Sequence, residues 1–172
     1  MKLSNKTGDY FRGNLFFVSL YQIKKVVMAT HCRIYVRINK EDFGKTLTAD
    51  ITKLPNPVEE NNYPCLPIKI HPHPLNDVLF LGIYCHFDGY PSGVGTELRN
   101  KFATYESALN LVLLGGVSHI INTIKSYHNW RNEGVDIRTL QGVVPTASDD
   151  YTYIFHDGEW HSIENYLNLF GE

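Results

Sequence analysis

An uninterrupted apolar stretch, residues 78–85 (Val-Leu-Phe-Leu-Gly-Ile-Tyr-Cys), constrains the fold more than any other part of the chain. Its length suits a strand and is short for a helix. A strand that is apolar on both sides must be covered on both faces, so we expect it at the centre of a sheet. The next ten residues, 86–95, hold three glycines and one proline and therefore predict a shaped loop.

Other segments predict further strands. Residues 32–38 alternate polar with apolar side chains, and β-branched residues dominate the apolar positions, which is typical of a half-buried strand. Residues 45–51 alternate more weakly and predict a second one. Residues 151–155 alternate clearly, and the Asp-Gly pair within residues 156–159 suits a type I′ turn. A partner strand is therefore expected over residues 160–163.

Helices are expected between these strands. Residues 96–102 fit a short helix, and Thr104 can cap a second one over residues 105–114. A third helix is predicted from Ser118 to about Arg131, because isoleucines recur there at helical spacing. Strands followed by helices and a hairpin favour an α+β domain: a small, mainly antiparallel sheet with two or three helices on one face.

The length of 172 residues fits one domain. The orderly strand pattern begins near Met28, which is an alternative start to Met1. We therefore expect residues 1–27 to be an N-terminal extension and residues 28–172 to form a single domain. Within that domain, residues 40–77 are rich in proline, which removes backbone donors from a sheet, so this segment is predicted to be an insertion at the surface.

Composition narrows the classes of function. The formal net charge of −2 means that the protein as a whole does not attract the negatively charged phosphates of nucleic acid. No direct nucleic-acid binding is therefore expected. No apolar run approaches the roughly 20 residues of a membrane span, and three cysteines without a CxxC pair do not suggest a disulfide framework. These features favour a cytosolic protein. The stretch from Asp149 to Glu172 holds six acids and no lysine or arginine, which indicates either a solvated face or a surface for a basic partner.

The candidate chemistry lies in residues 84–91, Tyr-Cys-His-Phe-Asp-Gly-Tyr-Pro. In an extended chain His86 and Asp88 share a face, where an imidazole and a carboxylate can bind one metal or pair as base and orienter. Cys85 faces the other side of a regular strand and joins the same metal only if the strand is bulged or has ended. The candidate zinc ligands are therefore Cys85, His86 and Asp88. The structural alternative is a loop in which Asp88 caps turn amides and His86 makes one hydrogen bond.

A rival metal set lies in the proline-rich insertion: Cys65, His71 and His73. Repeated X-Pro units favour polyproline II, whose period of three does not place His71 and His73 on one side. The sequence contains no P-loop, G-x-G-x-x-G, H-E-x-x-H or G-x-S-x-G pattern. No standard enzyme signature therefore competes with the motif at residues 84–91.

That motif resembles one found in a widespread family of small phage and prophage proteins, in which Trp or Phe follows Tyr-Cys-His. The resemblance continues through residues 101–108 and 111–118 and in the closing stretch 151–160. The chain also looks similar to zinc-containing type II-A anti-CRISPR proteins. It departs from the phage family in the extra residues 1–27, in the lengthened segment 40–77, and in the absence of a Tyr-His-Arg-Asp-Arg-Gly-Glu segment after Gly134.

The resemblance implies a phage-encoded, non-enzymatic protein that binds and inhibits a host CRISPR effector nuclease (Cas9), or another defence protein, in the cytoplasm of the bacterial host. It also implies a structural zinc. The alternative is a small metal-dependent hydrolase or nucleotide-binding enzyme that uses His86 and Asp88. An inhibitor forms a stoichiometric complex with its target and does not turn over, whereas an enzyme retains activity that His86→Ala abolishes.

Overall fold

The computed structural model describes residues 29–59, 65–71, 78–127, 136–139 and 150–171. The expected N-terminal extension, residues 1–27, lies outside the described residues. The strands of the described part are β1 (Cys32–Arg37), β2 (Thr46–Leu47), β3 (Ile68–Lys69), β4 (Leu79–Cys85), β5 (Val117–His119), β6 (Lys125–Ser126), β7 (Asp136–Thr139), β8 (Tyr151–His156) and β9 (Glu159–Ser162). Its helices are α1 (Val94–Lys101), α2 (Tyr105–Leu113) and α4 (Ile163–Phe170), with short 3-10 turns η1 (Lys40–Asp42) and η2 (Ile51–Lys53).

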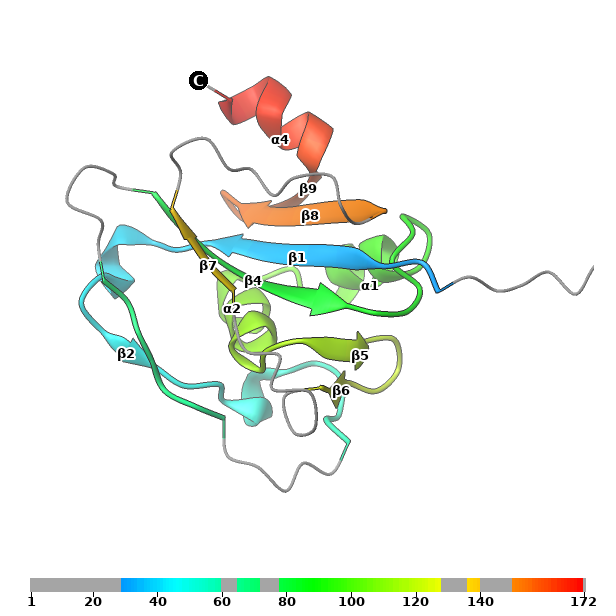
Figure 1. Cartoon of the computed structure of the whole chain (residues 1–172), viewed down its shortest axis with the longest axis horizontal. Helices are drawn as coiled ribbons and strands as arrows, with labels where there is room; N and C mark the ends of the chain where they lie inside the picture. The colour runs from blue at the N-terminus through cyan, green and yellow to red at the C-terminus, as the bar shows by residue number, and fades with distance from the viewer. Residues whose placement is uncertain (1–28, 60–64, 72–77, 128–135, 140–149, 172) are drawn as a thin grey trace, which may run out of the picture.

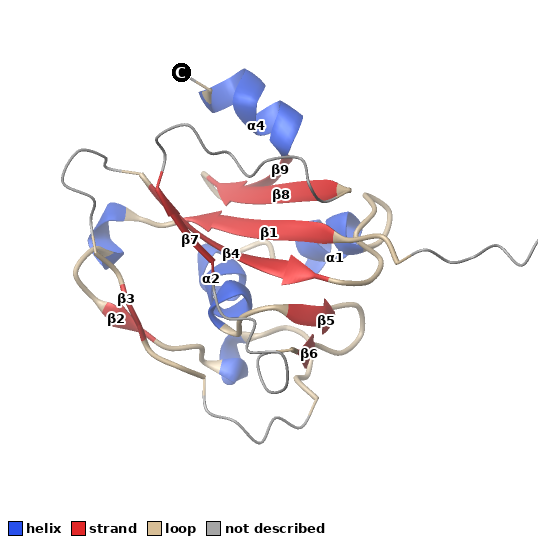
Figure 2. Cartoon of the chain, viewed as in Figure 1, coloured by secondary structure: helices blue, strands red, loops and turns tan. Residues whose placement is uncertain are grey.

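The main sheet has the strand order β6-β5-β4-β1-β8-β9, and β7 also pairs with β4 (Figures 1 and 2). Strand β1 is antiparallel to β4 and parallel to β8, and β4 is parallel to β5. The sheet is therefore mixed. Two strands share the second edge of β4: β7 pairs along Leu79–Gly82, and β5 pairs at Cys85. The apolar run at residues 78–85 is thus the central strand that the sequence predicts.

Alternation along β1 assigns the two faces of the sheet. Cys32, Ile34 and Val36 point into the larger core cluster, which also contains buried side chains of α1 and α2. Tyr35 points the other way, into a smaller cluster completed by residues of β4, β8 and α4: Phe80, Ile154 and Tyr166. Helices α1 and α2 therefore cover one face, and α4 packs on the opposite face beside β8 and β9. The α+β class is confirmed, while one helix lies on the face that the sequence analysis left uncovered.

Several local predictions are confirmed. The Thr104 side chain accepts a hydrogen bond from the amide of Ser107, which caps α2 as expected. In the hairpin of β8 and β9, Asp157 and Gly158 have φ angles of 53° and 82°, as a type I′ turn requires. Helix α4, which the sequence analysis did not anticipate, begins where the Ser162 side chain accepts from the amide of Asn165.

The third predicted helix, from Ser118 to about Arg131, is wrong for its described part. This segment contains β5 and β6 instead, and Asn122 between them has a left-handed φ of 64°. Ile120 and Ile124, which lie between the two short strands, are both fully buried. Their spacing of four residues imitated one face of a helix. The weak strand expected over residues 45–51 is limited to β2.

The described part of the proline-rich insertion is packed onto the domain rather than standing away from it. Asn56 is 4% exposed, and its amide donates to Glu97 Oε1 and to the carbonyl of Ile120, both at 2.6 Å. Its carbonyl oxygen accepts from Lys101 Nζ at 3.1 Å, and Lys101 also pairs with Glu97 at 2.8 Å. One buried amide therefore joins the insertion to α1 and to the segment after β5.

The first prediction concerns Asn56→Ala. The substitution leaves the Ile120 carbonyl buried without its donor, so we expect a loss of about 2 kcal/mol in the free energy of unfolding, measured by urea denaturation. Lys53→Ala is the control. Lys53 is an exposed side chain whose ion pair among the described residues is with exposed Glu106, so its loss should change stability by less than about 0.5 kcal/mol. Equal stabilities of the two variants would show that the Asn56 network does not anchor the insertion.

A second prediction follows from Glu97. Burial opposes ionisation of this carboxyl, but hydrogen bonds from Lys101 and Asn56 outweigh it and hold the pKa below the ordinary value of 4.5. A depressed native pKa means that the carboxylate stabilises the fold above the ordinary pKa and that this contribution is lost as the pH falls through the native pKa. Glu97→Gln should therefore lose more stability at neutral pH than in acid. Unfolding curves that differ from wild type by a constant amount across the acid range would contradict this.

Candidate functional site

The motif at residues 84–91 lies where β4 ends. Because β4 runs antiparallel to β1 and β1 runs parallel to β8, the starts of β1 and β8 lie at this same end of the sheet. Past Cys85 the chain continues along β5: the amides of His86 and Phe87 donate to the carbonyls of Val117 (3.1 Å) and Ser118 (2.9 Å). The motif is thus held by backbone bonds to β5 on one side and lies beside the start of β1 on the other.

Gly89 fixes the shape of the motif loop. A Cβ at this position would lie 2.6 Å from the carbonyl carbon of His31, so no other residue fits without a backbone shift. The Gly89 amide donates to the carbonyl of Thr30, and its own carbonyl accepts from the Tyr153 hydroxyl, both at 2.8 Å. Asp88, just before it, has a left-handed φ of 58°, which Asp tolerates better than most residues. Much of the motif therefore serves to press the loop against the start of β1.

The side chains of the motif diverge. Cys85 is fully buried in the helix-covered core, and its thiol lies 3.6 Å from the carbonyl of Phe87. His86 points to the opposite face of the sheet, where its ring meets Phe87 edge-on at a centroid distance of 4.5 Å. Asp88 is exposed, and its carboxylate accepts from the Tyr90 hydroxyl at 3.3 Å. The structure therefore does not bring Cys85, His86 and Asp88 around one point.

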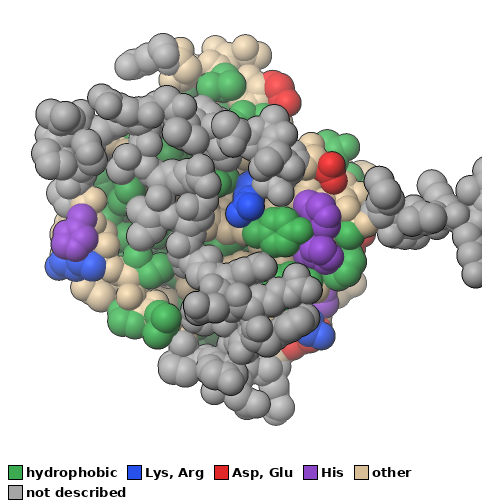
Figure 3. Space-filling model, in the orientation of Figure 1, with side chains coloured by type: hydrophobic (Ala, Val, Ile, Leu, Met, Phe, Trp, Pro, Cys, Tyr) green, Lys and Arg blue, Asp and Glu red, His purple; other side chains and the backbone are tan. Residues whose placement is uncertain are grey.

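A different set of side chains does converge. Tyr84 Oη lies 2.8 Å from Nδ1 of His86 and 2.8 Å from Nδ1 of His31, and the two imidazole rings are 4.5 Å apart between centroids. His31 and His86 occupy the next positions in register after the last ladder pair of β1 and β4, Cys32 with Cys85. Cross-strand neighbours in register share a face, so the sheet itself brings the two histidines together. Figure 3 shows histidine side chains gathered on this face of the molecule.

The hydrogen-bond chemistry assigns protons within this trio. His31 Nδ1 lies 2.9 Å from the carbonyl oxygen of His86, which can only accept, so His31 carries a proton on Nδ1. One arrangement that satisfies these distances shares the His31 Nδ1–H between the His86 carbonyl and the Tyr84 oxygen, while the Tyr84 hydroxyl donates to Nδ1 of His86, which then carries its proton on Nε2. These tautomers are inferred from the partners, as protons must be. In this arrangement the trio is a chain of hydrogen bonds that runs from His31 through Tyr84 to His86.

Charged groups surround the trio. The Arg33 guanidinium lies 5.1 Å from the centroid of the Tyr84 ring, its cross-strand neighbour, in cation–π geometry. On the other side the carboxylate of Asp150 accepts from the backbone amide of His31 at 3.0 Å. The start of β8 is thereby tied to the start of β1. The sequence analysis missed His31 and Tyr84. The alternation of strand side chains could have found them, because residues an even number of positions apart on a strand lie on the same face of the sheet.

The arrangement of the described residues does not match the expected zinc site. Among them, no group of three or more His, Cys, Asp and Glu side chains converges in a way that could hold a metal ion. Of the rival set, Cys65 is half-buried and His71 is exposed, while His73 lies outside the described residues. Burial raises the pKa of the Cys65 thiol, which disfavours the thiolate that zinc requires. Zinc stays a prediction from the sequence, and elemental analysis of the purified full chain tests it.

Comparison with known proteins adds no assignment: no protein-family model, no curated protein and no solved structure matches this chain. The resemblance to phage proteins therefore stays an expectation based on the motif. In the part of the chain that the structure describes, no helix is both long and apolar enough to cross a membrane.

A third prediction concerns the tautomers of the trio. In ¹⁵N-resolved NMR spectra recorded at a pH where both rings are neutral, His31 should carry its proton on Nδ1 and His86 on Nε2. Tyr84→Phe removes the bridging hydroxyl, so His86 should lose its single tautomer while His31, still bonded to a carbonyl, keeps Nδ1–H. His119, whose ring contacts Thr123 instead, is the internal control and should not change. The opposite tautomers in the wild-type protein would refute the assigned chain.

Proposed function

We propose that this chain is a phage-encoded anti-defence protein that binds and inhibits a host CRISPR effector nuclease (Cas9) in the bacterial cytoplasm, and that it does so with the sheet end that carries the motif. One observation carries the proposal. Three large aromatic side chains are exposed together at this end: Phe87 (41% exposed), Tyr90 (38%) and Tyr151 (37%).

These aromatics share the sheet end with two exposed carboxylates, Asp88 and Asp150. Asp88 belongs to the motif loop, and Asp150 contacts the His31 amide, so both follow the same strand ends as the aromatics. We call these five residues the motif-end surface: Phe87, Asp88, Tyr90, Asp150 and Tyr151. Its composition is aromatic and acidic, and two arginines adjoin it: Arg33 over the Tyr84 ring and Arg99, which donates to the Pro91 carbonyl.

Such a composition favours a basic protein partner. Tyr and Phe supply large contact areas at low entropic cost and receive arginine side chains over their rings, and carboxylates pair with arginine in bidentate geometry. Proteins that bind nucleic acid present such basic surfaces. A CRISPR nuclease, which must hold both a guide and a target strand, is therefore a chemically suitable target.

The arrangement revises which acids belong to the interface. From the sequence, the acidic stretch from Asp149 onward is either a solvated face or a surface for a basic partner. In the fold, Asp150 lies at the start of β8, whereas Asp157 and Glu159 lie at its far end, in and beside the hairpin turn. Asp149 lies outside the described residues. Only Asp150 is placed to act together with the motif loop.

The competing hypothesis is an enzyme that uses His86 and Asp88. The partly exposed pair of imidazoles joined by Tyr84 favours it, because such a chain can pass a proton. The two hypotheses differ in stoichiometry. If the chain is an inhibitor, loss of nuclease cleavage should reach completion at one equivalent of protein per Cas9–guide complex. Inhibition at a small fraction of one equivalent, abolished by His86→Ala in a folded variant, would favour the enzyme.

A fourth prediction tests the motif-end surface. Phe87→Ala should weaken binding to the Cas9–guide complex by about 2 kcal/mol, or about 30-fold, if the ring is an anchor of the interface. Leu169→Ala is the control, because Leu169 is 65% exposed on α4, away from the motif. Surface plasmon resonance measures both affinities, and equal binding of the two variants would contradict the proposal.

A matched pair of variants tests how much charge contributes to binding at the motif-end surface. Asp88→Asn and Asp157→Asn each neutralise an exposed aspartate with a left-handed φ, a conformation that Asn also tolerates, so neither strains the backbone. Asp88→Asn should slow association and reduce its dependence on salt, whereas Asp157→Asn at the opposite sheet end should leave both unchanged. Identical effects at the two positions would show that only net charge matters.

A further inference from the structure

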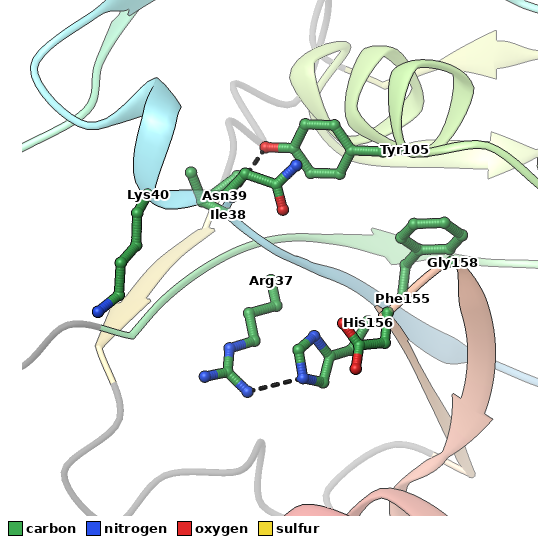
Figure 4. Close-up of a pocket in the computed structure, with 9 residues that line it drawn as sticks. Arg37, Ile38, Asn39, Lys40, Tyr105, Phe155, His156 and Gly158 are labelled. Atoms are coloured by element: carbon green, nitrogen blue, oxygen red, sulfur yellow. Dashed lines mark hydrogen bonds between the residues drawn. The ribbon is translucent and has the colours of Figure 1, made fainter.

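A cavity opens at the end of the sheet opposite to the motif, between the last residues of β1 and the β8–β9 turn (Figure 4). Its volume is about 400 Å³, which is within the range of small-molecule sites. Strands β1 and β8 are adjacent and parallel, and both end here. After them the chain turns in different directions, into η1 and into the hairpin turn, which is the kind of divergence that opens a crevice at strand ends.

The cavity contains a cation without a carboxylate partner. Arg37 is half-buried, and its guanidinium donates to Nε2 of His156 at 2.8 Å and to the Tyr166 hydroxyl at 3.3 Å. Both acceptors are neutral groups. Among the described residues, no carboxylate lies within ion-pair distance of Arg37. A partly desolvated charge with only neutral partners is better stabilised when an anion occupies the space beside it.

His156 increases the preference for an anion. A guanidinium only donates, so Nε2 of His156 holds a lone pair and the ring carries its proton on Nδ1. Burial, assisted by the charge of Arg37, lowers the pKa of His156 and keeps the ring neutral. The imidazole therefore fixes the orientation of Arg37 without neutralising it.

Lys40 supplies a second positive charge to the same cavity. Figure 4 shows the side chains of Lys40 and Arg37 extending on the same side of the strand, with His156 beyond Arg37. The walls include Ile38 and Tyr105, and the Tyr105 hydroxyl is engaged with Asp42 Oδ2 at 2.8 Å. Asp157 contributes one carboxylate to the lining, which suits hydroxyl groups of a ligand.

We propose that this cavity binds a small organic phosphate, with the phosphate on Arg37 and Lys40 and a hydroxyl-bearing part, such as a sugar, along the wall formed by Ile38 and Tyr105. Two cations against one carboxylate favour a monoanionic or dianionic group, and the volume exceeds what inorganic phosphate alone requires. The inference is independent of the proposed function, because the motif-end surface lies at the other end of the sheet.

The test is a calorimetric titration of the full chain with adenosine 5′-monophosphate, ribose 5-phosphate, inorganic phosphate and adenosine. We expect saturable binding of the two organic phosphates, weaker binding of inorganic phosphate and none of adenosine. Lys40→Ala should weaken binding about 10-fold, as loss of one charge-assisted contact does. Lys53→Ala, an exposed lysine that does not line the cavity, should bind as wild type does.

Arg37→Gln keeps a donor for His156 but removes the charge, so it should abolish phosphate binding, with a thermal melt confirming that the variant is folded. Absence of saturable binding of both organic phosphates up to about 10 mM would overturn the proposal. So would adenosine binding as tightly as its monophosphate, or equal binding by wild type, Lys40→Ala and folded Arg37→Gln. Binding to the Cas9–guide complex is not measured here, so neither result depends on the anti-defence role.

Discussion

The pairing of β1 with both β4 and β8 determines where every functional side chain lies. Because β1 is antiparallel to one neighbour and parallel to the other, its first residues meet the end of β4 and the start of β8, while its last residues meet the end of β8. A slip of one residue in either ladder would move Tyr35 and Arg37 to the face covered by α1 and α2, and Ile34 and Val36 to the opposite face. The hydrophobic alternation of a single strand thus fixes the register on which both sites depend.

Close packing between β1 and β4 reinforces this register. Gly82 lies opposite Tyr35, and a Cβ on Gly82 would overlap the Tyr35 ring. The ring therefore lies over the glycine, and Tyr35 is buried with Phe80 and Tyr166 beneath α4. At the end of the same ladder Gly89 performs the equivalent role against the backbone of His31. Two glycines on β4 and its loop thus let β1 approach closely at its middle and at its start.

The sequence predicted the parts of the fold that local chemistry decides. The apolar run became β4, the Thr104 cap began α2, and the Asp-Gly pair formed the turn of the β8–β9 hairpin. The segment after Gly116 could not be read in this way, because burial of Ile120 and Ile124 suits a helix and a strand–turn–strand equally. The parallel pairing of β1 with β8 was also beyond sequence patterns, since it joins segments more than a hundred residues apart.

The same limit explains the candidate site. The motif was visible because its residues are consecutive, yet consecutive residues on a strand diverge, and Cys85 accordingly went to the core. The partner that His86 does have, His31, is distant in sequence and arrives through register alone. Its imidazole bonds the carbonyl of His86 at the point where the backbone ladder between β1 and β4 stops, so a side chain extends the pairing by one step. The exposed aromatics that follow are then presented from a loop held on both sides, by His31 and Thr30 on one and by β5 on the other. A loop fixed in this way loses little conformational entropy on binding, which is the property that a rigid recognition surface requires.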